Sequence, residues 1–174
     1  MRMIEVESYN GVEIHQEDAN QLARNINVDL TYLDPPYNSR QYSRFYHVYE
    51  CLVQWKKPQL YGTALKPKEE NMSDYCRNAA FTAFTDLVSH IKSRYLVVSY
   101  NNTYHSKSSS SENKIKLEQL EEVLNKCGKT QVFNHEFKAF NSGKTEFDDH
   151  REYLFITEVD DEKRNQSFPD VLRG

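Results

Sequence analysis

The sequence predicts an α/β fold with a mainly parallel sheet and an antiparallel hairpin at one edge. Apolar runs that suit strands alternate with segments whose apolar residues recur at helical spacing. Near the end, two β-like stretches, 130–140 and 153–159, follow one another with only a polar turn, 141–151, between them. Alternating strands and helices are typical of a parallel sheet, and two consecutive strands are typical of a hairpin.

The first part of the chain predicts two strands and two helices. A β-like run over 12–16 leads into a short helix that Asp18 or Asn20 would cap. A strand is expected over 28–33, and it ends at two prolines, which cannot continue a sheet ladder. Apolar and aromatic residues within 41–55 fall close to one helical face, which predicts a helix there.

The middle of the chain predicts an excursion followed by a helix and a strand. Residues 56–78 contain two prolines, a glycine and mixed charge, so we expect them to leave the sheet topology. A helix is expected over 81–91, and the most apolar strand of the chain over 95–100. The segment "HSKSSSSEN", 105–113, has the composition of a disordered connector.

The last helix is expected over 115–127, with Gly128 stopping it in the usual position after a helix end.

A chain of 174 residues suits one domain with a real core, so we expect a single domain over 1–174. The net charge of -4 argues against a free-standing nucleic-acid clamp, because phosphate binding depends on clustered Lys and Arg.

The three cysteines have neither zinc-ligand spacing nor the even number of a disulfide framework, so no metal site is expected. No apolar stretch approaches the roughly 20 residues that cross a bilayer. The first ten residues lack the apolar centre of a secretory signal. These observations together predict a cytoplasmic protein.

The tetrapeptide DPPY, residues 34–37, carries the clearest chemistry. Asp34 and the carbonyl of Pro35 would accept the two N–H bonds of an exocyclic amino group and free its lone pair for attack. Proline holds that carbonyl in place because its φ is locked, and it offers no competing N–H. Tyr37 would stack on the ring that bears the amino group, a contact worth roughly 1–3 kcal/mol for a nucleic-acid base. A purely structural turn is the alternative, since Asp and Pro are common turn formers.

"DPPYNSRQYSRFYH" resembles the fourth motif of adenine-specific DNA methyltransferases of the Dam-like, alpha type. "LVVSYNN" is similar to the later motif in which a strand ends in a serine beside the target-base pocket, and "HREYLFITE" to the last strand of that family. "EDANQL" is similar to the segment whose acid reaches the adenine of the cofactor. The resemblance covers roughly residues 12–159, and it implies a partial Rossmann-like methyltransferase fold.

The resemblance implies a direct transfer of a methyl group from S-adenosyl-L-methionine to the exocyclic amino group of adenine in double-stranded DNA, without a metal. The adenine must be flipped out because its amino nitrogen is not reachable inside a duplex. The catalytic residues would be Asp34, Pro35, Pro36 and Tyr37. The cofactor would contact Asp18 and Asp34. The residues expected beside the DNA are Asn38, Arg40, Arg44, Ser99 and Asn101.

Arg40 and Arg44 lie four residues apart, so on one helix they would share a face. They would contact phosphates near the flipped nucleotide, or else pair on the surface with acids such as Glu50.

The sequence departs from the family in having only five glycines and no Phe-x-Gly-x-Gly-like loop. The target-recognition segment is also missing. We therefore expect the carboxyl-terminal catalytic half of a restriction-modification enzyme, as a truncation or the product of a split gene. It would need an N-terminal half that carries the glycine loop and target-recognition segment. The alternatives are an RNA or protein methyltransferase with a similar turn, and an inactive remnant that serves as an interaction module.

Overall fold

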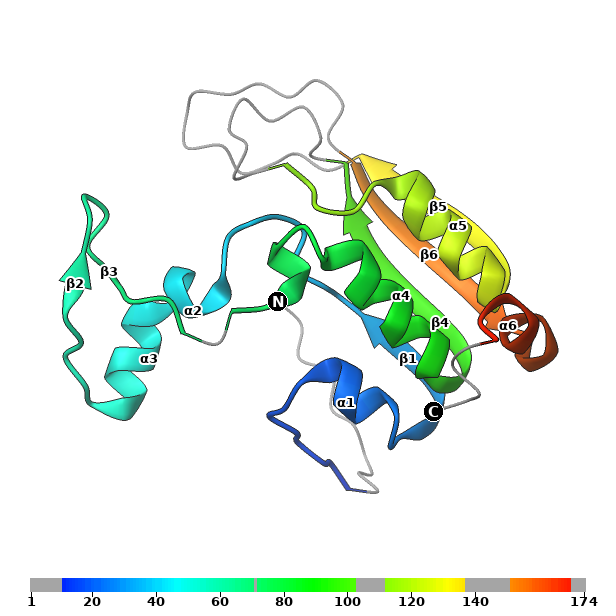
Figure 1. The fold of residues 1–174 in the computed structure, drawn as a ribbon, viewed down its shortest axis with the longest axis horizontal. Helices are drawn as coiled ribbons and strands as arrows, with labels where there is room; N and C mark the ends of the chain where they lie inside the picture. The colour runs from blue at the N-terminus through cyan, green and yellow to red at the C-terminus, as the bar shows by residue number, and fades with distance from the viewer. Residues whose placement is uncertain (1–10, 71, 103–111, 137–150, 170–174) are drawn as a thin grey trace.

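The computed structural model describes residues 11–70, 72–102, 112–136 and 151–169. A four-stranded sheet forms its centre, and helices pack on one face of that sheet (Figure 1). The strands of this sheet are β1 (Asn27–Leu33), β4 (Lys92–Asn101), β5 (Gly128–Glu136) and β6 (Arg151–Val159). The helices are α1 (Ala19–Ala23), α2 (Tyr42–Phe45), α3 (His47–Gln54), α4 (Ala80–His90), α5 (Leu117–Cys127) and α6 (Asp161–Ser167).

The sheet has the strand order β1-β4-β6-β5. β1 pairs with β4 in parallel, and β6 pairs antiparallel with both β4 and β5. Three of the four strands therefore run in one direction, and β6 alone runs against them. The α/β class and the antiparallel hairpin at one edge are confirmed, since β5 and β6 are consecutive in the chain and β5 is the edge strand.

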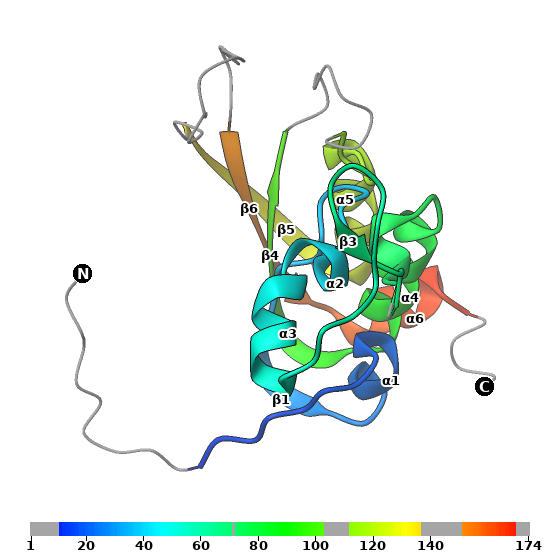
Figure 2. The same cartoon turned by 90° about the vertical axis from the view of Figure 1, so that its left-hand side faces the viewer.

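The core lies between the sheet and the helices α4 and α5 (Figure 2). Phe84 and Val88 of α4 are fully buried because the apolar residues of that helix recur on one face. From the sheet, Val98 and Phe155 are cross-strand partners that point into this core. The periodicity of α4, β4 and α5 therefore identified both the elements and the faces that they bury.

The predicted strand over 12–16 is wrong, because these residues have no regular structure. A strand is stable only when its backbone groups pair with a neighbour, and within the described ranges none lies beside this segment. The helix that follows it begins as expected at Asp18, whose carboxylate accepts a hydrogen bond from the Gln21 amide at 3.1 Å.

The predicted helix over 41–55 consists of two short helices, α2 and α3, that meet at Tyr46. Tyr46 has φ -102° and ψ 16°, outside the helical range. The aromatic face of these helices is exposed rather than buried, as in Phe45 and Tyr49. Helical spacing showed where the apolar residues gather, but it carries no information on whether another element covers them.

The excursion over 56–78 lies outside the central sheet, as expected. It contains a small two-stranded sheet, β2 (Leu60–Tyr61) with β3 (Lys66–Pro67), and a 3-10 turn, η1 (Asp74–Cys76). Most of the serine-rich segment 105–113 and of the turn 141–151 lies outside the described residues.

Helix α6 was not expected from the sequence. The sequence does contain a signal for its start, because Asp160 is a good capping residue and acids follow it in the first turn. In the structure the side chain of Asp160 accepts a hydrogen bond from the Lys163 amide at 3.0 Å. The guanidinium group of Arg164 is buried and donates to the carbonyl of Ile91 at 2.5 Å, which ties α6 to the end of α4.

Candidate active site

The DPPY segment follows directly on the last residue of β1, at the carboxyl end of the strand. Because β1 and β4 are parallel, their carboxyl ends lie at the same edge of the sheet. This arrangement brings Asp34 beside Ser99, although 65 residues separate them in the chain. The sequence prediction that a β4 serine lies near the DPPY segment is consistent with this geometry.

Asp34 lies within a short network of hydroxyl groups. Its Oδ1 accepts hydrogen bonds from the Tyr37 hydroxyl at 2.7 Å and from Ser99 Oγ at 3.2 Å. Ser99 in turn accepts from the Tyr32 hydroxyl at 3.0 Å. Asp34 itself is exposed, so these hydroxyl groups orient the carboxylate without closing it off from a ligand.

A second carboxyl group, that of Glu152, lies near this network and was missed in the sequence. Glu152 is on β6, where it is paired with Asn101 of β4. Burial, together with the charge of Asp34, raises the pKa of Glu152 above its ordinary value. The sequence could not place Glu152 near Asp34, because only the register between β4 and β6 brings the two carboxyl groups together.

Tyr37 is held by packing as well as by hydrogen bonds. Its ring packs against the ring of Tyr100 in a T-shaped contact, with centroids 5.0 Å apart. Its carbonyl accepts from the Lys114 amide at 2.8 Å and from the Tyr100 hydroxyl at 3.2 Å. Burial, and next the hydrogen bond to Asp34, raise the pKa of Tyr37 well above its usual range. Tyr37 therefore stays a neutral donor toward Asp34.

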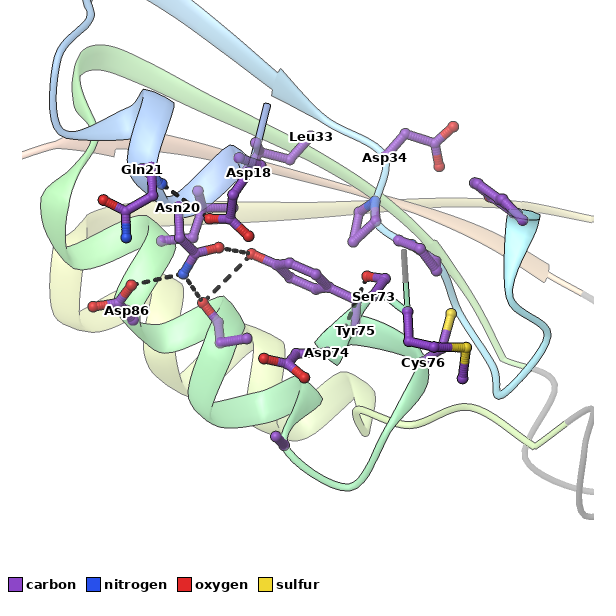
Figure 3. Close-up of a pocket in the computed structure, with 18 of the residues that line it drawn as sticks. Asp18, Asn20, Gln21, Leu33, Asp34, Ser73, Asp74, Tyr75, Cys76 and Asp86 are labelled. Atoms are coloured by element: carbon purple, nitrogen blue, oxygen red, sulfur yellow. Dashed lines mark hydrogen bonds between the residues drawn. The ribbon is translucent and has the colours of Figure 1, made fainter. Parts of the chain in front are cut away.

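An open cavity of about 1270 Å³ lies against the DPPY segment. Its walls come from the start of α1, the end of β1, η1 and α4 (Figure 3). Asp18 and Asp34, the two residues expected to contact the cofactor, both line it. Figure 3 shows the carboxyl group of Asp34 turned away from the group formed by Asp18, Asn20 and Tyr75. The backbone of Asp34 therefore borders the cavity, while its carboxylate points toward the hydroxyl groups of Tyr37 and Ser99.

The wall of the cavity opposite Asp34 is organised by Asn20, which sequence reasoning named only as a capping residue. Its amide nitrogen donates to Asp86 at 2.6 Å and to the Ala83 carbonyl at 2.8 Å. Its amide oxygen accepts from the Tyr75 hydroxyl at 2.7 Å. One side chain thus joins α1, η1 and α4, and it holds the segment that carries Asp18 in place.

Asp86 is the charged centre of this wall. Burial alone would raise the pKa of Asp86, but hydrogen bonds from Arg24 and Asn20 outweigh it and hold that pKa below its ordinary value of 3.8. Arg24 forms an ion pair with it at 2.7 Å and also donates to the Asn20 carbonyl. The carboxylate is therefore ionised and paired at neutral pH.

The residues expected beside DNA lie in three different settings. Asn38 accepts from the Arg40 amide at 3.0 Å, which makes a local turn. Arg40 precedes α2, so the expected shared helical face with Arg44 does not exist. Arg44 pairs with Glu69 of the excursion at 2.6 Å. Asn101 is buried at the end of β4, and its carbonyl accepts from Asn113.

The described residues contain no group of three or more His, Cys, Asp or Glu side chains that would hold a metal ion. The same ranges include no helix with the length and apolar character needed to cross a membrane. Cys51, Cys76 and Cys127 are free thiols.

The fold and the site define an α/β domain of the methyltransferase type. Three features define it: the mixed sheet, the proline-rich turn at the end of β1, and the serine of β4 beside its acid. The model of the D12 class N6 adenine-specific DNA methyltransferases matches residues 4–94, more than half of the chain. The chain belongs to this family.

Three curated proteins are similar to between 49% and 85% of this chain. The type II methyltransferase M.NlaIII of Neisseria lactamica is 34% identical over 155 residues, which are 85% of this chain and 43% of that protein. The type II methyltransferase M.FokI of Planomicrobium okeanokoites is 32% identical over 152 residues, 84% of this chain and 22% of that protein. The modification methylase StsI of Streptococcus sanguinis is 41% identical over 88 residues, 49% of this chain and 14% of that protein.

The chain therefore spans less than half the length of these relatives. No solved structure matches the chain significantly.

Proposed function

We propose that this chain is the catalytic half of an S-adenosyl-L-methionine-dependent DNA methyltransferase of a restriction-modification system. The reaction would transfer a methyl group to the exocyclic amino group of an adenine in double-stranded DNA. The observation that carries the proposal is the DPPY segment at the end of β1, with Ser99 beside Asp34, in a chain that belongs to this family. The family and its relatives favour DNA over RNA or protein as the substrate.

The residues around the cavity fit the proposed cofactor. S-adenosyl-L-methionine would supply an activated methyl group on a sulfonium centre and carries an ammonium group. Asp18 and Asp34 both line the cavity; Asp18 adds negative charge to it, while the carboxyl group of Asp34 is turned toward Tyr37 and Ser99. Tyr75 adds apolar surface for a flat ring. Asp18 would bind the adenosine part, because it lies on the wall that Asn20 and Tyr75 organise.

The turn itself would prepare the target nitrogen for attack. Asp34 and the carbonyl of Pro35 would accept its two N–H bonds, which draws its geometry toward a tetrahedron and exposes the lone pair. The Tyr37 and Ser99 hydroxyl groups would hold Asp34 in position, so little rearrangement is needed at reaction time. Pro36 would keep the turn rigid, since its φ is locked.

The nucleic-acid contacts would lie around the same edge of the sheet. Tyr37 would stack on the flipped adenine, with Ser99 and Asn101 beside it at the end of β4. On the side of α2, the sugar-phosphate backbone of the DNA would run past Asn38, Arg40 and Arg44. Arg44 would have to exchange its pairing with Glu69 for a phosphate oxygen.

A complete enzyme would include a further segment that carries the glycine loop and reads the DNA target. We also place the reaction in the cytoplasm, and we take the chain as one domain over 1–174. The sequence lacks a glycine-rich loop, which favours the alternative of an inactive remnant if no complementary segment exists. The catalytic half and the inactive remnant predict opposite results in the same assay: methyl transfer with a complementing segment in the first case, and none in the second.

The test is a labelled-methyl transfer assay on adenine-containing DNA. It would use this chain alone and this chain co-expressed with a segment that supplies the glycine loop. We expect transfer only in the second case, and we expect Asp34→Ala and Asp34→Asn to abolish it, because neither side chain accepts a hydrogen bond with a full negative charge. Glu121→Gln, a substitution of an exposed acid of α5 that lies neither on β1 nor at the cavity, is the matched control and should leave transfer unchanged.

Activity that survives Asp34→Ala would refute the role of Asp34. Absence of transfer with every complementing segment, from a complex that is folded, would favour the remnant.

A further inference from the structure

The two faces of the sheet differ sharply in what covers them. Tyr32, Val97 and Ile156 are cross-strand partners in one row of β1, β4 and β6. The next row, which contains Val98 and Phe155, points to the opposite face and is buried under the helices. Within the described ranges no helix packs on the face of the first row: Figure 2 shows α1, α4, α5 and α6 on the other side of the sheet, and α3 in front of its edge.

The uncovered face exposes apolar side chains near both of its edges. On β1, Leu30 has 55% and Tyr32 58% of its surface exposed, and on β5, Phe133 has 50%. The register places Phe133 beside Leu154 of β6, next to Ile156 on the same face, so apolar side chains of β5 and β6 extend the apolar row of Tyr32, Val97 and Ile156. Strands that pair in parallel are found in sheets with both faces covered. Exposed apolar residues that gather on one face and are bordered by polar ones mark an interaction site.

The free edge of β1 adds a second feature to the same surface. β1 pairs with β4 on one side, and in the described sheet it is the edge strand on the other. Its seven residues contain no proline, lysine or arginine, which are the usual means of protecting an edge from pairing. The unpaired backbone groups of β1 can therefore accept another strand.

A strand added in parallel beside β1 would end at the rim of the cavity described above. The carboxyl end of β1 leads directly into Asp34 and Pro35, which line that cavity. The carboxyl end of a parallel neighbour lies at the same edge of the sheet, where open α/β sheets bind their ligands. The loop that follows such a strand would thus close the cavity on its open side.

We propose that the β1 edge and the uncovered sheet face are the docking surface for the rest of a methyltransferase domain. This inference rests on the proposed function. The occupant is a polypeptide segment that supplies a strand parallel to β1, a loop over the cavity, and an apolar helix for the uncovered face. The relatives leave room for it, since the matched region is 43% of M.NlaIII.

A second copy of this chain fits the surface less well. A two-fold axis at the β1 edge would pair the two β1 strands antiparallel. The two cavities would then lie at opposite ends of the joined strands, and neither would receive a loop from its partner. The glycine loop that the proposed function requires would still be missing.

The test is co-expression of this chain with the tagged portion of M.NlaIII that it does not match. We expect a one-to-one complex, in which the amide hydrogens on the free edge of β1 exchange much more slowly than in the chain alone, because they gain ladder partners. Leu30→Lys should weaken the complex about tenfold or more, since it places a charge in an apolar contact. Ile14→Lys is the matched control: Ile14 is 90% exposed, lies in no strand, and should leave the complex intact.

Four outcomes would overturn the docking surface: no complex, a complex without protection of β1, a complex that Leu30→Lys and Ile14→Lys weaken equally, or self-association of the chain through β1. The methyl-transfer assay separates this inference from the proposed function. A complex with protected β1 and no transfer leaves the docking surface standing and counts against the proposed function. Methyl transfer that Leu30→Lys leaves unchanged would support the proposed function and count against the docking surface.

Discussion

At the scale of single residues, Tyr37 has two separable features. Its hydroxyl orients Asp34, and its ring packs against Tyr100 and would stack on the target base. We expect Tyr37→Phe to keep the affinity of the assembled enzyme for DNA with an unpaired adenine, because the ring remains. Tyr37→Ala should lose roughly 1–3 kcal/mol of that affinity. Fluorescence anisotropy with labelled duplex measures both variants.

The melting temperature of each Tyr37 variant is the control for folding, because Tyr37→Ala also removes the contact with Tyr100. A Tyr37→Ala protein that melts like the wild type and binds the DNA equally well would show that the ring is only a packing residue.

Asp86 predicts a dependence of stability on pH. Its folded pKa lies below the ordinary value of 3.8, so the unfolded chain takes up the proton first as the pH falls. The stabilisation by Arg24 and Asn20 is therefore present above that value and is lost as the pH drops through the folded pKa. We expect the free energy of unfolding to fall at acid pH in the wild type and less steeply in Asp86→Asn.

At neutral pH, Asp86→Asn should cost at most about 1 kcal/mol, because the ion pair with Arg24 is partly exposed. Urea titrations at several pH values measure both effects. If the free energy of unfolding falls equally steeply with decreasing pH in the wild type and in Asp86→Asn, Asp86 is not the group that titrates. Asp74→Asn, an exposed acid of the same cavity wall, is the matched control.

At the scale of elements, Gly128 shows why a residue that ends a helix needs its tertiary setting to be understood. The sequence prediction that the helix stops at Gly128 is confirmed, but its φ of 172° is extended backbone and not the left-handed conformation of a usual glycine cap. A Cβ atom at this position would lie 2.0 Å from the Glu158 carbonyl oxygen. The glycine is therefore required by the close approach of β5 and β6.

We expect Gly128→Ala to lower the free energy of unfolding by about 3 kcal/mol, because the backbone of the hairpin must shift. Gly62→Ala is the control: Gly62 has a positive φ but nothing near its missing side chain, so only its backbone strain, about 1 kcal/mol, applies. Chemical denaturation compares the two. Equal losses would show that the contact with Glu158 relaxes at no cost.

The helices α2 and α3 mark the limit of periodicity as a guide. Their apolar residues recur at helical spacing, yet Phe45, Tyr49 and Trp55 are exposed, Trp55 by 86%. Figure 1 shows both helices standing away from the central sheet, beyond the edge that β1 forms. A hydrophobic face is a property of the helix itself, whereas burial requires a second element that this part of the chain does not provide.

At the scale of the whole molecule, the cavity has acidic walls but lacks a glycine-rich loop. Asp18 and Asp34 line it, while the sequence offers no cluster of glycines that would let a backbone approach a cofactor closely. We expect this chain alone to bind S-adenosyl-L-methionine weakly or not at all in isothermal titration calorimetry. Addition of a segment that docks on β1 should raise the affinity.

Micromolar binding of the cofactor by the purified chain alone would contradict this prediction. Asp18→Asn in the assembled enzyme is the companion measurement. It should weaken cofactor binding while the complex with the docking segment stays intact, because Asp18 lies on the cavity wall and not on the β1 edge.

The sequence by itself determined the α/β class, the strands β1, β4 and β6, and the helices α4 and α5. Each of these carries its own period of apolar residues, and that period depends only on local geometry. DPPY was recognisable for the same reason, since a strand that ends in two prolines is a local feature. The tertiary structure decided which residues meet: Ser99 and Glu152 come to Asp34, Asn20 joins Tyr75 and Asp86, and Arg44 meets Glu69. It also decided that one face of the sheet and the edge of β1 stay uncovered, because contacts between distant segments depend on strand order and register, which no single segment encodes.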